Sequence, residues 1–279
     1  MSSRRLLMVD GDPAVHALLA DLLKQEDRTV QGVSGGQEAL ELLRTTPYDL
    51  VVADPGRNGS DGSKLVRRVR AVQPDTKVIL TGAQDPGKAI AALRAQAYSY
   101  FHKPLTPAPF AEIVRQALLA SSSWKKDIQV RSARPEWVTL EVSCKMEAAE
   151  RATQLLRELT ADVSTGLSDD VTVAFHELLM NAIEHGCKSD PKKRVHVSVL
   201  RTSESLIVHL RDPGKGFSLE RIEHAAVNNP DNDPTRHVEI RAEQGQRPGG
   251  FGILMASKLV DELLYNERGN EVFFQKNIR

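Results

Sequence analysis

Residues 1–121 alternate short apolar runs with segments of helical spacing, and this alternation restricts the fold more than any other feature of the chain. The apolar runs predict strands at residues 5–10, 29–33, 49–54, 77–81 and 98–102. The segments of helical spacing predict helices at residues 13–26, 36–44, 64–72, 88–96 and 109–120. A chain that alternates strands and helices forms a parallel sheet with helices on both faces. We therefore predict an α/β domain over residues 1–121.

Residues 137–279 follow a different rhythm, because apolar and polar residues alternate along short segments. The segments at residues 195–200 and 206–211 are close together and predict an antiparallel hairpin. Further strands are predicted at residues 137–143, 264–267 and 271–275, and helices at residues 147–159, 169–185 and 252–263. Ser168 is expected to cap the helix at 169–185, and Gly186 to end it. The pattern predicts an α+β sandwich with helices on one face of a mixed or antiparallel sheet, after a polar linker at residues 122–136.

The composition excludes several classes of partner. The chain has 37 basic and 37 acidic side chains, so no overall field attracts DNA or an anionic membrane, and no basic helix indicates direct DNA binding. No apolar stretch approaches the ~20 residues that span a bilayer, and the N-terminus lacks the apolar region of a signal peptide. We therefore expect a cytoplasmic protein. Cys144 and Cys187 have no metal-binding spacing and are expected to be buried or free thiols.

Four polar side chains follow separate predicted strands of the first domain. They are Asp10, Asp54, Thr81 and Lys103. Ligands of a parallel α/β sheet bind beyond the carboxyl ends of its strands. Two carboxylates there can hold Mg²⁺, and one of them can attack phosphorus as a nucleophile. The lysine can neutralise phosphoryl oxygens and the hydroxyl can donate a hydrogen bond to one of them. Each residue alone is more typical of a turn, but four at corresponding places indicate a site.

These residues lie in motifs that resemble the receiver domains of response regulators, over residues 4–121. The matching segments are VDGDP at 9–13, DPGRNGSDG at 54–62, LTG at 80–82 and YFHKP at 100–104. The resemblance implies a flavodoxin-like (βα)5 fold and phosphorylation of Asp54. It implies that Asp10, Asp54 and the Gly56 carbonyl contact the metal, and that Lys103 pairs with the acids.

The same resemblance implies that Thr81 and Tyr100 form a switch pair, although Tyr100 can also be a plain strand aromatic. One position departs from the family pattern. Receivers carry two adjacent acids after the first strand, whereas here Gly11 follows the first acid and Asp12 comes next. The missing carboxylate should weaken Mg²⁺ binding unless Asp12 reaches the site. A pseudo-receiver that only docks to partners is therefore an alternative.

A second set of polar residues lies along the helix predicted at residues 169–185. Glu177, Asn181 and His185 follow an i, i+4, i+8 spacing and share one stripe of this helix. A polar stripe alone is more often a solvated helix face. Here, however, Asp212 ends a strand and leads into Gly214 and Gly216, where the backbone can approach a planar ligand. The glycines at residues 249–252 then lead into a helix whose N-terminal N–H groups can cradle phosphate.

This region resembles the GHKL ATPases, and closely the anti-sigma-factor serine kinases, over residues 137–276. The segments that carry the resemblance are HELLMNAIEHG at 176–186, RDPGKGF at 211–217 and PGGFGILMASKLVDELLYNERGNEVFFQK at 248–276. It implies that Asn181 holds Mg²⁺, that Asp212 recognises the adenine amino group, and that Glu177 is the general base. The resemblance also assigns a set of residues to ATP binding: Gly214, Gly216, Gly250, Phe251 and Gly252.

The leading interpretation is a response regulator whose output domain is a serine/threonine protein kinase that uses ATP and Mg²⁺. The partners expected from the resemblance are an upstream histidine kinase, an anti-anti-sigma-type substrate protein, and a sequestered sigma factor or similar regulator. A homodimer is a further candidate assembly, and the sequence leaves the oligomeric state open. One alternative is a protein that binds ATP and captures a partner without phosphate transfer. A histidine kinase with His176 as phosphoacceptor is disfavoured, because His176 lies inside the helix expected to bind Mg-ATP.

Overall fold

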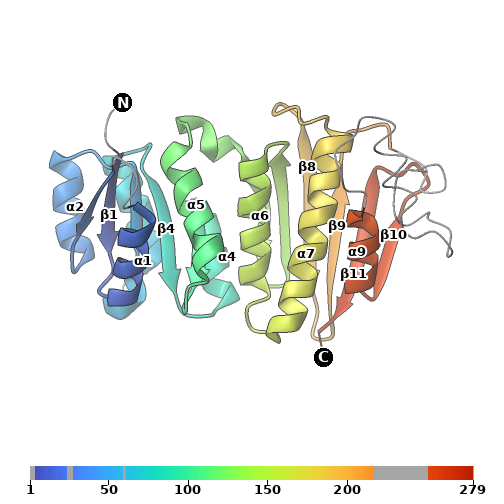
Figure 1. Ribbon diagram of the computed structural model, residues 1–279, viewed down its shortest axis with the longest axis horizontal. Helices are drawn as coiled ribbons and strands as arrows, with labels where there is room; N and C mark the ends of the chain where they lie inside the picture. Colours follow the sequence, from blue (N-terminus) through green and yellow to red (C-terminus); the bar gives the residue numbers. More distant parts are fainter. Residues whose placement is uncertain (1–3, 24–27, 59–60, 217–250, 279) are drawn as a thin grey trace. The chain divides into compact units, whose positions relative to one another are not determined.

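The computed structural model describes residues 4–23, 28–58, 61–216 and 251–278. Its residues group into two compact units. The first comprises Met1–Lys125 with Gln154–Asp162, and the second comprises Lys126–Thr153 with Val163–Arg279. Each unit is built on one sheet, which Figure 1 shows in blue to green for the first and in green to red for the second.

The first unit contains a parallel sheet of five strands. They are β1 (Arg4–Val9), β2 (Arg28–Gly32), β3 (Leu50–Ala53), β4 (Lys77–Gly82) and β5 (Ser99–His102). Their order in the sheet is β2-β1-β3-β4-β5, and every neighbouring pair is parallel. The predicted (βα)5 architecture is confirmed.

Helices cover both faces of this sheet. Successive side chains of a strand point to opposite faces, so an apolar strand needs a layer of helices on each side. The helices are α1 (Pro13–Leu23), α2 (Gly36–Thr45), α3 (Gly62–Val72), α4 (Pro86–Arg94) and α5 (Pro107–Leu119). Leu6 and Met8 of β1 pack with residues of α1 and α5, whereas Leu7 and Val9 pack with residues of α2, α3 and α4. Burial of each such side chain contributes about 2 kcal/mol. With both faces covered, the carboxyl edge of the sheet is where polar side chains can gather.

The second unit contains an antiparallel sheet of six strands. They are β6 (Ile128–Arg134), β7 (Trp137–Ser143), β8 (Arg194–Arg201), β9 (Ser205–Arg211), β10 (Glu262–Tyr265) and β11 (Glu271–Asn277). Their order is β10-β11-β9-β8-β7-β6. The two predicted hairpins are confirmed as the antiparallel pairs β8–β9 and β10–β11.

Helices of the second unit lie on one face of its sheet, as the α+β prediction requires. They are α6 (Met146–Leu159), which belongs to this unit up to Thr153, α7 (Thr165–Asn181), and α9 (Gly252–Leu259). The π-helical turn η3 (Ala182–Gly186) continues α7. Figure 1 shows α7 and α9 side by side over the strands, and residues of the two helices are in contact. Phe175, Leu178 and Leu179 of α7 are buried in this core.

Several sequence predictions are wrong in detail. The predicted linker contains the short helix η2 (Ser122–Lys126) and the strand β6, which pairs with β7. A register shift between Val130 and Ser132 breaks the alternation that would have marked this strand. The helix predicted at 169–185 begins at Thr165, with Ser164 at its N-cap position, and Ser168 is buried within it. The helix predicted at 252–263 ends at Leu259, because β10 begins at Glu262.

The cysteines also differ from expectation. Cys144 and Cys187 are both buried, but they form a disulfide instead of two thiols. Sequence spacing could not reveal this bond, because 43 positions separate the two residues and only the fold brings β7 near the end of η3.

Candidate functional sites

An acidic site lies at the carboxyl edge of the parallel sheet. Asp10 directly follows β1, Asp54 follows β3, Thr81 lies near the end of β4, and Lys103 follows β5. The Lys103 Nζ lies 2.9 Å from Asp10 Oδ2 and 2.7 Å from Asp54 Oδ2. The Thr81 hydroxyl donates to Asp10 Oδ2 at 3.3 Å. The structure therefore brings the four predicted residues together.

Asp12 belongs to the same site. Its carboxylate lies 3.4 Å from Lys103 Nζ, and its backbone N–H donates to Asp10 Oδ1 at 2.9 Å. Burial acts to lower the pKa of Lys103, but its hydrogen bonds to Asp54 and Asp10 raise it above the usual value, so the side chain is a cation. Three carboxylates thus face one ammonium group, which leaves excess negative charge. Asp12 approaches the site in spite of Gly11.

The donor chemistry of this edge fits Mg²⁺. Asp10 and Asp54 offer carboxylate oxygens, and hard cations prefer oxygen ligands. Among the described residues, no group of three or more His, Cys, Asp or Glu side chains is arranged to hold a metal ion. A magnesium ion here therefore has to complete its coordination with backbone carbonyl oxygen and water, which is usual for Mg²⁺. The Gly56 N–H donates to Asp54 Oδ1 at 2.9 Å, so the backbone at Gly56 lies next to the Asp54 carboxylate.

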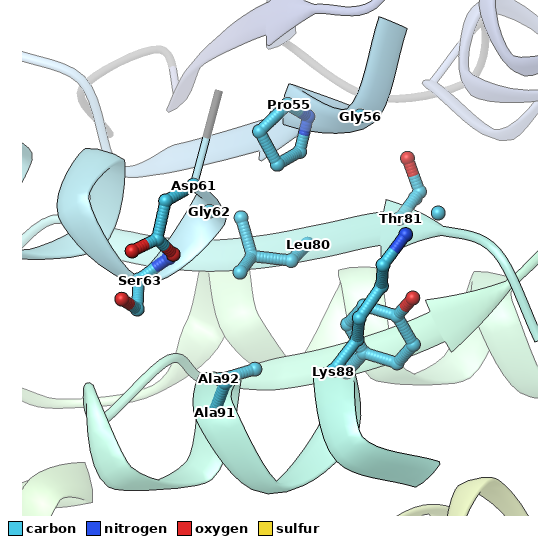
Figure 2. A pocket seen from close by; sticks show the side chains of 12 residues that line it. Pro55, Gly56, Asp61, Gly62, Ser63, Leu80, Thr81, Lys88, Ala91 and Ala92 are labelled. Atoms are coloured by element: carbon cyan, nitrogen blue, oxygen red, sulfur yellow. The ribbon is translucent and has the colours of Figure 1, made fainter. Parts of the chain in front are cut away.

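A cavity of about 130 Å³ opens beside the acidic site, between β4, α4 and the start of α3. Figure 2 shows Lys88 extending from α4 towards Thr81. Tyr100 also lines this cavity, and its hydroxyl donates to the Ala83 carbonyl at 2.7 Å. Burial raises the pKa of Tyr100, so the phenol is a neutral donor. Both predicted switch residues therefore border one cavity.

In the second unit, two polar side chains of α7 face the start of α9. A Cβ atom added to Gly252 would lie 2.6 Å from Glu177 Oε2 and 3.5 Å from Asn181 Nδ2. Gly252 is the first residue of α9, and the first N–H groups of a helix have no partner within the helix. A carboxylate, an amide and the first turn of a helix are thus gathered in one place. Phe251 precedes them and is exposed.

Asp212 follows β9 and is held by backbone groups. Its N–H donates to the Asn270 carbonyl at 3.0 Å, and the Asn270 side-chain amide donates to the Asp212 carbonyl at 3.1 Å. Its carboxylate accepts from the Gly214 N–H at 2.7 Å. Burial raises the pKa of Asp212. The remaining carboxylate oxygen is suited to accept from an amino group.

Glycines are required around Asp212 because the backbones approach closely. A Cβ on Gly186 would lie 2.2 Å from the Asp212 carboxyl carbon, and one on Gly214 would lie 2.6 Å from Asp212 Oδ1. Gly216 has a φ of +78°, and a Cβ there would lie 1.8 Å from the Arg268 carbonyl oxygen. The sequence assigned Gly186 only the role of ending a helix. The signal that could have revealed more is its position after the Glu177–Asn181 stripe, one residue before Cys187.

Other predicted residues have plainer surroundings or lie outside the described residues. A ring nitrogen of His176 is 3.3 Å from the Thr153 hydroxyl, and His185 is exposed in η3. Gly250, Phe217 and the glycine-rich segment ending at Gly250 belong to residues 217–250, which the structure does not describe.

The chain joins a parallel α/β unit with an acidic carboxyl edge to an antiparallel α+β sandwich with a glycine-lined site. The chain belongs to the histidine kinase-like ATPase domain family, which it matches over residues 129–276. Residues 6–115 match the response regulator receiver domain. The chain is therefore a receiver domain fused to a GHKL-type ATPase domain. The ATPase match includes most of β6, in agreement with the pairing of this strand.

Similar proteins come from two-component systems. The transcriptional regulatory protein GlrR of Escherichia coli K12 is 32% identical over 133 residues, which are 46% of this chain and 30% of GlrR. The sensor histidine kinase GacS of Pseudomonas protegens is 31% identical over 41% of this chain and 13% of GacS. A response regulator of Thermotoga maritima of known structure is 28% identical, with 43% of this chain and all of that chain covered and a TM-score of 0.39. This chain thus spans less than a third of either curated relative.

Within the ranges that the structure describes, every helix is too short or too polar to cross a membrane.

Proposed function

We propose that Asp54 accepts a phosphoryl group from an upstream histidine kinase. The proposal is supported by the ion pair between Lys103 and Asp54, which places a cation where phosphoryl oxygens need neutralisation. The Asp54 carboxylate attacks phosphorus, and the bond from phosphorus to the donor breaks. Asp10, Asp54 and the Gly56 carbonyl hold Mg²⁺, which supplies positive charge for the phosphoryl group. After the transfer, the Thr81 hydroxyl donates a hydrogen bond to one of the phosphoryl oxygens on Asp54.

The second unit, in this proposal, is an ATP-dependent serine/threonine protein kinase of the anti-sigma-factor type. Its substrate is a small anti-anti-sigma-type protein, and its sequestered partner is a sigma factor or similar regulator in the cytoplasm. ATP supplies the phosphoryl group. Asn181 holds the magnesium ion of the nucleotide, Asp212 accepts from the adenine amino group, and the described glycines Gly214, Gly216 and Gly252 admit the ligand. Glu177 takes the proton of the substrate hydroxyl.

One observation carries this assignment: Glu177 and Asn181 converge on Gly252 at the start of α9. Transfer from a nucleotide to a hydroxyl uses a base close to the metal-bound phosphates, and Glu177 lies one helical turn from Asn181. A polar stripe that merely faced solvent would leave no steric demand for glycine at Gly252. The match of residues 129–276 to the histidine kinase-like ATPase domain family supports the use of ATP by this unit.

The test is Glu177→Gln in the full chain. This change keeps the size of the side chain and removes its basicity, so phosphate transfer to the substrate protein should be lost while ATP affinity is preserved. Glu184→Gln is the matched control, because Glu184 is an exposed glutamate of η3 on the same continuous helical segment. Transfer by Glu177→Gln at the wild-type rate would remove the assignment of Glu177 as the base. Absence of transfer by the wild type, with ATP bound, would remove the kinase assignment and favour a module that binds ATP and captures a partner. Phosphohistidine at His176 would favour a histidine kinase.

A further inference from the structure

The disulfide joins two segments that end next to each other inside the second unit. Cys144 directly follows β7, and Cys187 directly follows η3. The two Cα atoms are 6.2 Å apart, which lies within the usual range for disulfides. The residues are 1% and 0% exposed, and they are the only two cysteines of the chain. The thiol chemistry of this protein is therefore confined to one buried pair.

The bond fixes a strained segment. The two residues after Cys187, Lys188 and Ser189, have φ angles of 59° and 52°, which non-glycine residues rarely adopt. The Cys187 N–H donates to the Ala182 carbonyl at 2.8 Å, and the Ser189 N–H donates to the Ile183 carbonyl at 2.9 Å. Such a conformation persists only where the surroundings hold it, and the covalent bond to Cys144 is the strongest restraint on it.

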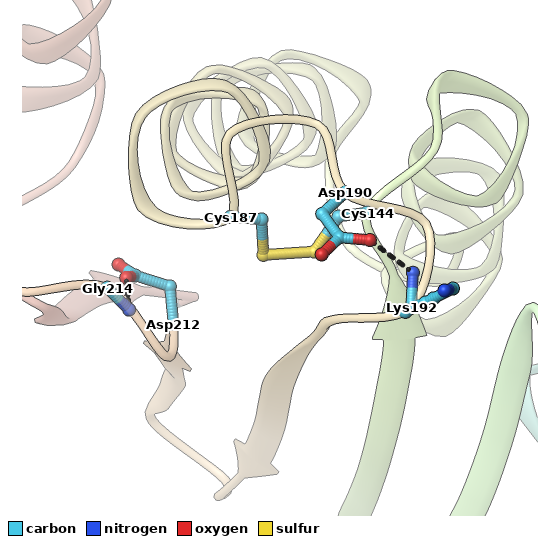
Figure 3. The surroundings of a disulfide bond; sticks show 6 residues. All are labelled: Cys144, Cys187, Asp190, Lys192, Asp212 and Gly214. Carbon is cyan, nitrogen blue, oxygen red and sulfur yellow. Dashed lines mark hydrogen bonds between the residues drawn. A yellow bond between two sulfur atoms is a disulfide. The ribbon is translucent and has the colours of Figure 1, made fainter.

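The other end of this turn, at residues 190–193, is hydrogen-bonded to Cys144. Asp190 accepts from the Lys192 N–H at 2.9 Å, as the dashed line in Figure 3 shows, and its carbonyl accepts from the Lys193 N–H at 3.0 Å. The Cys144 N–H then donates to the Lys193 carbonyl at 3.3 Å. Both ends of the turn at residues 187–193 therefore meet at the disulfide.

Gly186 connects this turn to Asp212. It immediately precedes Cys187, and its Cα is so close to Asp212 that an added Cβ would lie 2.2 Å from the carboxyl carbon. Figure 3 shows Asp212 and Gly214 beside the turn that carries Cys187. Gly186 also approaches Gly214, because a Cβ on Gly214 would lie 2.8 Å from the Gly186 carbonyl oxygen. A shift of the backbone at Cys187 must therefore move the groups that position the Asp212 carboxylate.

We propose that Cys144 and Cys187 form a reversible redox modification site that controls nucleotide affinity through the Gly186–Asp212 contact. The inference rests on the proposed role of Asp212 in adenine binding. In the oxidised form the bond holds Gly186 against Asp212, and nucleotide binds tightly. A dithiol donates two electrons and two protons: the Sγ–Sγ bond breaks, two protein thiols form, and the dithiol becomes a disulfide. Lys188 and Ser189 then relax, Gly186 shifts, and nucleotide binds more weakly.

The expected coupling is about tenfold in affinity, within the range usual for linked sites. Linkage makes it reciprocal, so saturating nucleotide must make the pair harder to reduce by the same factor. For a two-electron couple, a tenfold factor corresponds to about 30 mV in the midpoint potential. Bound nucleotide should also slow reduction, because the buried sulfur atoms are reached only when the turn opens. A disulfide that served only as a structural link distant from the nucleotide would show neither effect.

The experiment uses the full chain in both redox states. Glutathione disulfide oxidises the pair and dithiothreitol reduces it, and a thiol count of zero or two reports the state. Calorimetry then measures the affinity for a non-hydrolysable ATP analogue with Mg²⁺, and a redox titration with and without that analogue gives the potentials. The double variant Cys144→Ser/Cys187→Ser is the control, because its affinity must be the same in both reagents and near that of the reduced wild type.

Each outcome decides the proposal. About tenfold weaker binding after reduction, with a lower midpoint potential in the presence of nucleotide, supports it. Equal affinity in the two states overturns the redox control alone and leaves ATP binding intact. Absence of binding in both states overturns the proposed ATP site and the redox control with it. Failure of the two thiols to pair, or loss of secondary structure in the circular dichroism spectrum on reduction, also overturns it, because the bond would then be absent or only structural.

Discussion

The acidic site of the first unit and the glycine-lined site of the second are built in different ways. In the first, side chains as far apart in sequence as Asp10 and Lys103 meet because the carboxyl ends of parallel strands share one edge. In the second, one continuous helical segment supplies Glu177 and Asn181, and the missing side chains of Gly186 and Gly252 let other groups come close. The first site therefore depends on which side chains are present, and the second also depends on which are absent.

The largest expected effect tests the first half of this comparison. Asp54→Ala should abolish phosphorylation completely, because the variant lacks the nucleophile that Lys103 contacts at 2.7 Å. An acyl phosphate and Mg²⁺ serve as donor and cofactor, and intact-protein mass spectrometry counts the phosphoryl groups. Asp75→Ala is the control, because Asp75 is an exposed carboxylate of the same unit, with 74% of its side chain accessible. A phosphoryl group retained by Asp54→Ala would place the acceptor at another residue, whereas its absence from the wild type would support a pseudo-receiver.

The next largest effect tests the glycine-lined site of the second unit. Gly252→Ala should lower the rate of phosphate transfer about 100-fold, because the new methyl group displaces the Glu177 carboxylate and a small misplacement of a reacting group is costly. ATP affinity should fall less, because the added Cβ lies 2.6 Å from Glu177 Oε2 but 3.5 Å from Asn181 Nδ2, the group assigned to the magnesium ion of the nucleotide. Transfer assays and calorimetry separate the two quantities.

The matched control for that variant is Gly166→Ala. Gly166 lies in the first turn of α7, and nothing stands within 4 Å of an added Cβ. Alanine is favoured over glycine in a helix by roughly 1 kcal/mol, so this variant should be slightly more stable and fully active. Full activity of Gly252→Ala would show that the close approach to Glu177 has no role in transfer, and the contrast between the two sites would be lost.

A smaller effect concerns regulation across the chain. Phosphorylation adds about −1.5 to −2 charges at the acidic edge, and Thr81 and Tyr100 border the cavity beside it. We expect phosphorylated protein to differ from unphosphorylated protein in kinase rate or partner affinity by about tenfold, a usual size for coupling between sites. Thr81→Ala and Tyr100→Phe should reduce this difference without changing ATP affinity, because they remove the hydroxyl groups that contact Asp10 and Ala83.

Tyr48→Phe is the control for the tyrosine variant. Tyr48 is also a buried tyrosine of the first unit, but its hydroxyl bonds to Gln31 and it does not line the cavity. Equal rates and partner affinities for the two phosphorylation states of the wild type would contradict the coupling and leave the receiver as a localisation or dimerisation module.

The same comparison explains how much of the molecule the sequence predicts. The convergence of Asp10, Asp54 and Lys103 could be predicted, because strand ends are visible as apolar runs and parallel topology places these residues on one edge. The contact between Gly186 and Asp212 could not be predicted, because the position of Gly186 after the Glu177–Asn181 stripe does not show which residue approaches it. The Cys144–Cys187 bond and the strand β6 were missed for related reasons. The disulfide depends on a contact between residues far apart in the sequence. The register shift after Val130 breaks the alternation of apolar and polar residues that would have indicated β6.

The smallest expected effect returns to the acidic site and asks whether its unusual sequence matters. Gly11→Asp restores the second adjacent acid, and more negative charge should tighten Mg²⁺ binding. The gain should be only about threefold, less than the ~1.4 kcal/mol that corresponds to a factor of ten, because Asp12 already lies 3.4 Å from Lys103 and compensates in part. Magnesium titration by calorimetry measures it. Gly35→Asp is the control, because an added Cβ at Gly35 meets nothing within 4 Å. A gain much above tenfold would mean that Asp12 does not substitute for the missing acid, and Asp12→Ala would then leave Mg²⁺ affinity unchanged.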